Sequence, residues 1–219
     1  MPDTFFDPHQ RATIEAAMAR IIPTDDTPGA REAGCIDFLD RTLSGLDYLF
    51  AKPDGSGFEV LEGLTAQAWR TRLDIMRAKY VDGVRDLDAR AERLGARDFT
   101  SLDPERQDAV LRAVERDAHS APTTSTVSTG LAGPVSAEPA LQQTSTETEL
   151  DFLPLLVTHT RQGFYADPIY GGNRGRVGWD VIGFPGPASM KEVHEGTYTT
   201  LQYFAEGEAE KVKEFHHGL

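Results

Sequence analysis

Apolar residues in the first 118 positions recur every three or four residues, which is the spacing of one face of an α-helix. The longest such run begins at Thr65 and continues to Leu94, and Gly95 can end it. It predicts one long amphipathic helix, or two helices with a bend near Gly83. Shorter runs with the same period predict three further helices, carrying Ile14, Ala17, Met18, Ile21 and Ile22, then Ile36, Leu39, Leu43 and Leu46, and then Val110, Leu111 and Val114.

Two of these helices have start signals. Asp7 can cap a helix whose first residue is Pro8, and Gln10 stands where a capping box needs its second side chain. Asp103 followed by Pro104 is a similar start for the fourth helix. Residues 1–118 are therefore predicted to form a helical scaffold. Cys35 lies among apolar helix positions with no histidine near it in the sequence, so we expect it to be a packing residue.

Residues 119–148 differ in kind from this scaffold. From Ser120 to Thr148 the chain is dominated by Ser, Thr, Ala, Pro and Gly, and it contains no Lys, Arg or aromatic residue. Such a segment cannot bury enough apolar surface to offset the entropy lost on ordering. We therefore expect a flexible linker or an extended arm that becomes ordered only against a partner surface.

Residues 149–219 return to an ordinary composition and are predicted to form one domain with the scaffold. Asp151 can cap a helix that tolerates Pro154 in its first turn and carries an apolar face that includes His159. We expect His159 to be a core or interface histidine bonded to the backbone, with catalysis or metal binding as the alternative. The C-terminal tail after Gly186 mixes apolar and charged residues, and we expect its end to be a solvated terminus.

A glycine-rich loop, residues 163–186, follows that helix. Seven of its twenty-four residues are Gly, and five aromatic residues lie among them. This mixture rules out a regular helix and lacks the alternation of a long strand. It predicts an ordered, irregular loop that serves recognition, because glycine permits close backbone approach and aromatic rings supply contact area. The predicted fold is thus a mainly α, bundle-like domain with a long irregular glycine- and aromatic-rich loop and an extended arm.

Several kinds of enzyme site do not fit this loop. Gly172, Gly175 and Gly178 are spaced G-x-x-G-x-x-G, which misses the dinucleotide fingerprint, and no hydrophobic strand precedes them. No phosphate-binding loop, nucleophile elbow, H-E-x-x-H or C-x-x-C occurs in the chain. Asp167, Asn173 and Asp180 carry oxygen ligands, but their spacing is not that of a calcium loop. We therefore expect neither a cofactor nor a metal in this chain.

The charge and hydropathy exclude two further classes. With 35 acidic and 22 basic residues, the net charge of −13 argues against binding to nucleic acid. No apolar run approaches the roughly 18 to 20 residues of a membrane span, and the N-terminus lacks an export signal. These features predict a cytoplasmic protein.

Two parts of the sequence resemble the gluconate 2-dehydrogenase subunit 3 family. The first is Ile21-Ile22-Pro23-Thr24-Asp25-Asp26 with Pro28-Gly29-Ala30-Arg31-Glu32-Ala33-Gly34. The second lies in the glycine-rich loop and comprises Gly163-Phe164-Tyr165-Ala166-Asp167-Pro168, Tyr170-Gly171-Gly172-Asn173, Gly178-Trp179 and Ile182-Gly183-Phe184-Pro185-Gly186. The resemblance thus covers both ends of the predicted domain.

The resemblance implies that this chain is a non-catalytic small subunit. Its partner would be a large, FAD-binding dehydrogenase subunit of the glucose-methanol-choline type, which oxidises a sugar or glycoside and can pass electrons to a cytochrome or another acceptor. The chain would stabilise and mature that subunit, in a heterodimer or larger complex, without binding FAD itself. Family members often carry a twin-arginine export signal, and none is visible here. A cytoplasmic member, such as those paired with glycoside 3-dehydrogenases, is expected, or a periplasmic one if the signal was removed or belongs to the partner.

The loop is the predicted interface with this partner. Its expected contact residues are Phe164, Tyr165, Asp167, Pro168, Tyr170, Gly171, Gly172, Asn173, Arg174, Trp179, Phe184 and Pro185. Two alternatives remain open. One is an independent enzyme or small-molecule-binding protein with a pocket around His159, Asp167, Asn173 and Arg174. The other is an assembly chaperone that leaves its partner after folding.

Overall fold

The computed structural model describes residues 4–120, 147–184, 186–187 and 190–196, without the side chains of residues 119, 120 and 190. In this part of the chain the architecture is helical, and its only β pairing is a single bridge between Ala51 and Phe58. The mainly α fold is therefore confirmed. Most of the predicted arm, the C-terminal tail from residue 197 and Pro185 lie outside the described residues.

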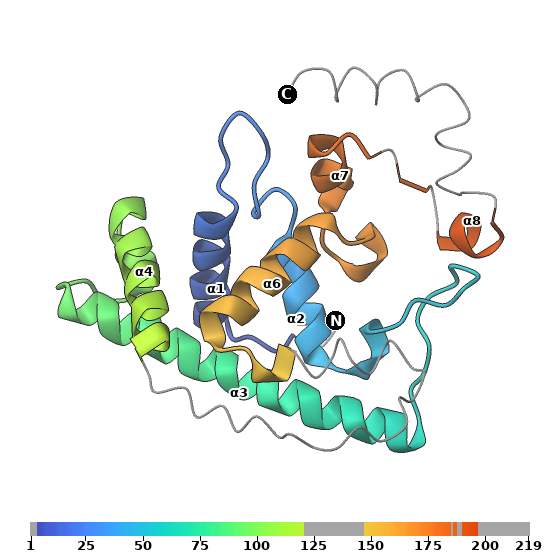
Figure 1. Ribbon diagram of the computed structural model, residues 1–219, viewed down its shortest axis with the longest axis horizontal. Helices are drawn as coiled ribbons and strands as arrows, with labels where there is room; N and C mark the ends of the chain where they lie inside the picture. The colour runs from blue at the N-terminus through green and yellow to red at the C-terminus, as the bar shows by residue number, and fades with distance from the viewer. Residues whose placement is uncertain (1–3, 121–146, 185, 188–189, 197–219) are drawn as a thin grey trace.

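Five long helices build the core. They are α1 (Pro8–Ile21), α2 (Cys35–Ser44), α3 (Gly63–Arg93), α4 (Pro104–Ser120) and α6 (Phe152–Tyr165). Figure 1 shows α3 running along one side of the molecule, with α1, α2 and α6 on the same face of it and α4 beside its C-terminal end. Two short helices follow, α7 (Val177–Val181) and α8 (Met190–His194), and α7 lies on the side away from α3.

The start of α1 has the predicted capping box. The Asp7 carboxylate accepts hydrogen bonds from the backbone N–H groups of His9 and Gln10, each at 2.8 Å. The Gln10 side chain in turn accepts from the Asp7 N–H at 3.2 Å. These bonds satisfy N–H groups that have no partner inside the helix.

The long apolar run forms one continuous helix, so the alternative of two helices does not occur. Gly83 lies within this helix, where the ring of Phe152 packs against it. A Cβ atom at position 83 would lie 2.2 Å from that ring, so only glycine fits there. The helix ends at Arg93, and Gly95 follows with a φ of +80°, a conformation that favours glycine.

One core holds these helices together. Its fully buried large side chains come from four of the long helices, from the short η2 helix (Phe99–Ser101) and from the start of the glycine-rich loop. They are Ile14, Met18, Leu39, Leu43, Leu73, Met76, Tyr80, Leu87, Phe99, Leu155, Leu156 and Phe164. Cys35 is also fully buried, and burial raises the pKa of its thiol to about 12, so its predicted packing role is confirmed.

Replacing Asp7 with Ala should lower the free energy of unfolding by about 1 kcal/mol, because two N–H groups at the start of α1 lose their acceptor. Equilibrium unfolding in urea measures this change. Asp26→Ala is the control, because Asp26 is exposed and in no described hydrogen bond, and its effect should stay within about 0.5 kcal/mol. Equal stability of Asp7→Ala and the unaltered chain would contradict the capping role.

Candidate functional site

The glycine-rich loop begins at a close contact between α2 and α6. Gly163 faces Cys35, and a Cβ atom at position 163 would lie 3.0 Å from the Cys35 Cα. The Gly163 carbonyl then accepts a hydrogen bond of 2.7 Å from the Asn173 N–H, which folds the loop back onto α6. Gly172 lies over the same carbonyl, where a Cβ would come within 2.1 Å of the oxygen. These glycines therefore allow backbone-to-backbone contact that side chains would prevent.

Asn173 links the two halves of the loop from the inside. Its amide donates to the Ala166 carbonyl at 3.0 Å, and its carbonyl oxygen accepts from the Gly178 N–H at 2.8 Å. The residue is fully buried and has a φ of +45°, a conformation that asparagine tolerates better than most residues. Its side chain thus serves the structure of the loop.

A charged cluster ties the loop to α2 and to the N-terminal segment. The Arg174 guanidinium pairs with Asp37, and Arg11 pairs with both Asp37 and Asp40. Asp40 is buried and also accepts from the N–H groups of Phe5 and Phe6, at 2.8 and 3.0 Å. Burying a carboxylate is costly unless it is paired and hydrogen-bonded, and these contacts meet that requirement.

Trp179 is the apolar anchor of the second half of the loop. Its indole N–H donates to the Tyr165 carbonyl at 2.7 Å, and its ring meets Phe184 edge to face with centroids 5.2 Å apart. A Cβ atom at Gly186 would lie 2.0 Å from the indole, so glycine is needed where the chain crosses the ring. The indole therefore fixes where Gly186 lies against α7.

The loop consists of short helical pieces, namely the last residues of α6, then η3 (Pro168–Tyr170), η4 (Arg174–Arg176) and α7. The predicted interface residues separate into three groups by exposure. Phe164, Gly172, Asn173 and Trp179 are buried in this chain; Asp167, Pro168, Tyr170 and Gly171 are partly exposed; and Tyr165, Arg174 and Phe184 are exposed. The buried group shapes the loop, and the exposed group lies at its surface.

Sequence reasoning missed two exposed apolar residues of this loop. Val181 and Ile182 are 42% and 57% exposed. Like Phe184, which is 37% exposed, they follow Trp179 in the sequence. We call Tyr165, Val181, Ile182 and Phe184 the loop patch. The two β-branched apolar residues after Trp179 could have indicated this surface. However, a five-residue helix is too short for its periodicity to show which face is exposed.

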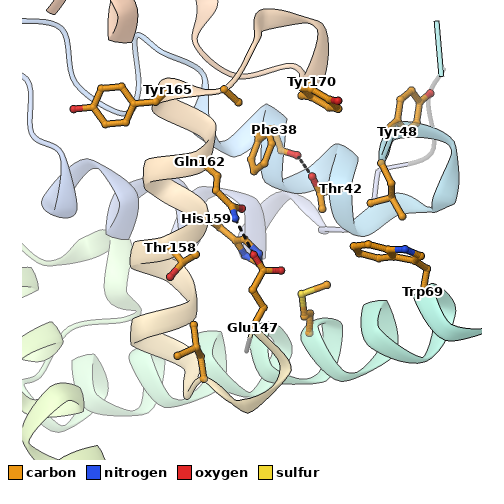
Figure 2. A pocket seen from close by; sticks show the side chains of 14 residues that line it. Phe38, Thr42, Tyr48, Trp69, Glu147, Thr158, His159, Gln162, Tyr165 and Tyr170 are labelled. Carbon is orange, nitrogen blue, oxygen red and sulfur yellow. Dashed lines mark hydrogen bonds between the residues drawn. The ribbon is translucent and has the colours of Figure 1, made fainter. Parts of the chain in front are cut away.

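The loop polar groups and His159 do not share a site. Asp167 caps η3 by accepting from the Ile169 N–H at 2.9 Å, and Asn173 and Arg174 are bonded as described above. His159 instead lines a pocket of about 750 Å³ between α2, α3 and α6. Figure 2 shows this pocket, which is lined by Phe38, Thr42, Tyr48, Leu49, Trp69, Met76, Glu147, Leu150, Thr158, His159, Gln162, Tyr165, Ala166 and Tyr170.

His159 is a buried, hydrogen-bonded histidine, but its partner is a side chain and not the backbone. Its Nδ1 lies 2.7 Å from the Tyr80 hydroxyl, and the two rings are stacked. Burial lowers the pKa of His159 to about 4 and raises the pKa of Tyr80 well above its usual value of 10. Both groups are therefore uncharged near neutral pH.

The described residues offer neither a metal site nor a membrane-spanning helix. No group of three or more His, Cys, Asp or Glu side chains there could hold a metal ion. Among the described helices, none is long and apolar enough to cross a membrane.

Comparison with protein families matched residues 8–186 of the chain to the model described as gluconate 2-dehydrogenase subunit 3. This range includes α1, the charged cluster and the whole glycine-rich loop. The comparisons with curated proteins and with solved structures gave no match.

Asn173→Ala should lower the free energy of unfolding by about 3 kcal/mol, because the Ala166 carbonyl and the buried Gly178 N–H lose their partners. Urea unfolding gives the total change, and hydrogen exchange should show faster exchange across residues 167–184. Asp180→Ala, an exposed position in the same loop, should change stability by no more than about 0.5 kcal/mol. Unchanged exchange in Asn173→Ala would refute the linking role of this side chain.

Of the histidines, His9 should have a pKa above the ordinary value of 6.5, and His159 should have one below it. The side-chain hydrogen bond to Asp88 raises the pKa of His9, whereas burial lowers that of His159 to about 4. Between pH 6.5 and about 4 the unfolded chain therefore protonates His159 while the native chain does not, so stability falls as the pH falls through this window. The contribution of His9 is complete below pH 6.5 and is lost as the pH rises through its raised pKa.

NMR of chain labelled with ¹⁵N-histidine measures both values, with signals assigned by His9→Gln and His159→Gln. Protonation of His159 near pH 6.5 in the native chain would refute its assigned environment.

Proposed function

Because the chain belongs to the gluconate 2-dehydrogenase subunit 3 family, we propose that it is the non-catalytic small subunit of an FAD-dependent sugar or glycoside dehydrogenase complex. The large subunit of this complex, of the glucose-methanol-choline type, carries the FAD and the catalytic groups. The small subunit binds the large subunit and stabilises it during maturation. The family match across residues 8–186 is the observation that carries this proposal.

The state of the loop's polar side chains supports the non-catalytic part of the proposal. Asp167 caps η3, Asn173 bonds two backbone groups, and Arg174 pairs with Asp37. A side chain that acts as a general acid or base must reach the substrate, whereas these side chains are bonded within the loop and hold it in shape. Their arrangement favours a loop that is built for recognition.

The loop patch supports the proposal of a protein partner. Val181, Ile182 and Phe184 present apolar surface in one segment, and Tyr165 and Arg174 are exposed elsewhere in the loop, Arg174 with 64% of its side chain accessible. Aromatic residues and arginine are enriched in the cores of protein interfaces. Because Trp179 and Asn173 fix the backbone beneath the patch, binding would cost little additional ordering.

A large flavoprotein subunit of the glucose-methanol-choline type from the same organism provides the test. Produced with the small subunit, it should be soluble, loaded with flavin and active, and the two should elute together in gel filtration. Produced alone, it should lose most of its soluble yield and flavin. Equal yield, flavin content and activity with and without this chain would refute the proposal. A partner that matures fully but elutes alone would indicate a transient chaperone instead.

Two matched variants test the contact surface. Ile182→Asp should weaken the complex by at least about tenfold, or roughly 1.4 kcal/mol, because it places a charge in an apolar contact. Leu94→Asp is the control: Leu94 and Ile182 directly follow α3 and α7, are 50% and 57% exposed, and the ends of these two helices lie in different regions of the molecule. Affinity can be measured by biolayer interferometry. Equal loss in both variants, or in neither, would exclude the loop patch as the contact.

A further inference from the structure

The pocket between α2, α3 and α6 has a wall of aromatic rings. Trp69 of α3 and Tyr48 and Tyr170 line one side of it, as Figure 2 shows. Each ring has an edge-to-face neighbour: Phe50 packs on Trp69 at 5.5 Å, and Phe58 packs on Tyr48 at 5.5 Å and on Tyr170 at 5.7 Å between centroids. These neighbours hold the wall in place and leave ring surface toward the pocket.

His159 contributes a hydrogen-bond donor to the same pocket. The buried Tyr80 hydroxyl has no described partner other than His159 Nδ1, so its proton is satisfied only if it is donated to that nitrogen. The proton of the neutral imidazole is then on Nε2. Nε2 has no hydrogen-bond partner among the described residues. It is accessible, because Thr13 Oγ1 is the only buried side-chain N or O atom without a partner in the described part of the chain. Since His159 is only 1% exposed, the Nε2–H reaches open space through the pocket that His159 lines.

Three polar side chains around the pocket already have partners in the chain. Thr42 donates to the Phe38 carbonyl and Thr158 to the Pro154 carbonyl, both at 2.9 Å. The Gln162 amide donates to the Glu147 carboxylate at 2.8 Å. A sugar ring needs several hydrogen bonds to replace those it makes with water, and these three side chains are already bonded within the chain. The Glu147 carboxylate also disfavours an anion.

We propose that this pocket is a binding site for a flat, uncharged ring that carries one hydrogen-bond acceptor, such as a carbonyl group. The ring lies against Trp69 and its neighbours, and the carbonyl oxygen accepts the Nε2–H of His159. Pockets that are mainly apolar with one or two oriented polar groups are the usual form of small-molecule sites, and the volume of about 750 Å³ lies in their range. The proposal concerns the chain alone and does not rest on its role as a subunit.

Calorimetric titration of the full chain with 1-acetonaphthone, an uncharged aromatic ketone, tests this site. Saturable 1:1 binding is expected. 1-Ethylnaphthalene has the same ring system without the acceptor and should bind about fivefold more weakly, the effect of one hydrogen bond. In the ¹⁵N-histidine spectrum the Nε2 signal of His159 should move with the ketone and much less with the hydrocarbon.

Trp69→Ala should weaken ketone binding by about tenfold through the loss of ring contact. Trp69 is only partly buried, so this variant should fold, which its far-ultraviolet circular dichroism checks. Leu64→Ala, on the same helix but 83% exposed and outside the pocket, should bind like the unaltered chain. The proposal is overturned if neither naphthalene binds, if both bind equally, if methyl α-glucopyranoside binds more tightly than the ketone, or if Trp69→Ala has no effect.

Discussion

The contact between α2 and α6 at Cys35 and Gly163 determines the position of the glycine-rich loop. Because residue 163 has no side chain, α6 lies against the backbone of α2, and the Gly163 carbonyl is free to accept the Asn173 N–H. That bond brings Arg174 to the start of α2, where its N–H donates to the Ala33 carbonyl at 2.9 Å and its guanidinium meets Asp37. A larger residue at position 163 would separate the helices and remove the support of the loop.

Acidic residues have structural as well as surface roles in this chain. Asp40 gathers the N-terminal segment and α1 around one buried carboxylate. Asp98 accepts bonds from Thr100 and Ser101 in the η2 turn, and the Ser101 hydroxyl, followed by Thr100 and Arg97, holds the pKa of this carboxyl well below its usual value. Several of the carboxylates that contribute to the net charge of −13 are therefore bonded to groups within the fold.

The helices could be predicted from the sequence because long apolar periods and caps are local signals. The Asp7 capping box, the single run from residue 63 to 93 and the start at Pro104 all follow from residues close together in the chain. Asp151 precedes α6 as expected, although its side chain makes no capping bond. The glycine-rich loop was expected to be irregular throughout, whereas residues 163–165 end α6 and residues 177–181 form α7. Its buried and exposed sides could not be separated from the sequence. Whether Asn173 lies inside and Ile182 outside depends on contacts with Ala166, Gly178 and Tyr165 that no local pattern encodes.

The two tryptophans of the chain lie at the two surfaces for which binding is proposed. Trp69 forms part of the pocket wall and is partly exposed, whereas Trp179 is 5% exposed beneath the loop patch, with its N–H on the Tyr165 carbonyl. An indole in contact with water emits at longer wavelength than a buried one, so the native chain contains two spectrally different reporters. Its intrinsic fluorescence can therefore distinguish a molecule that enters the pocket from a protein that covers the loop, without any added label.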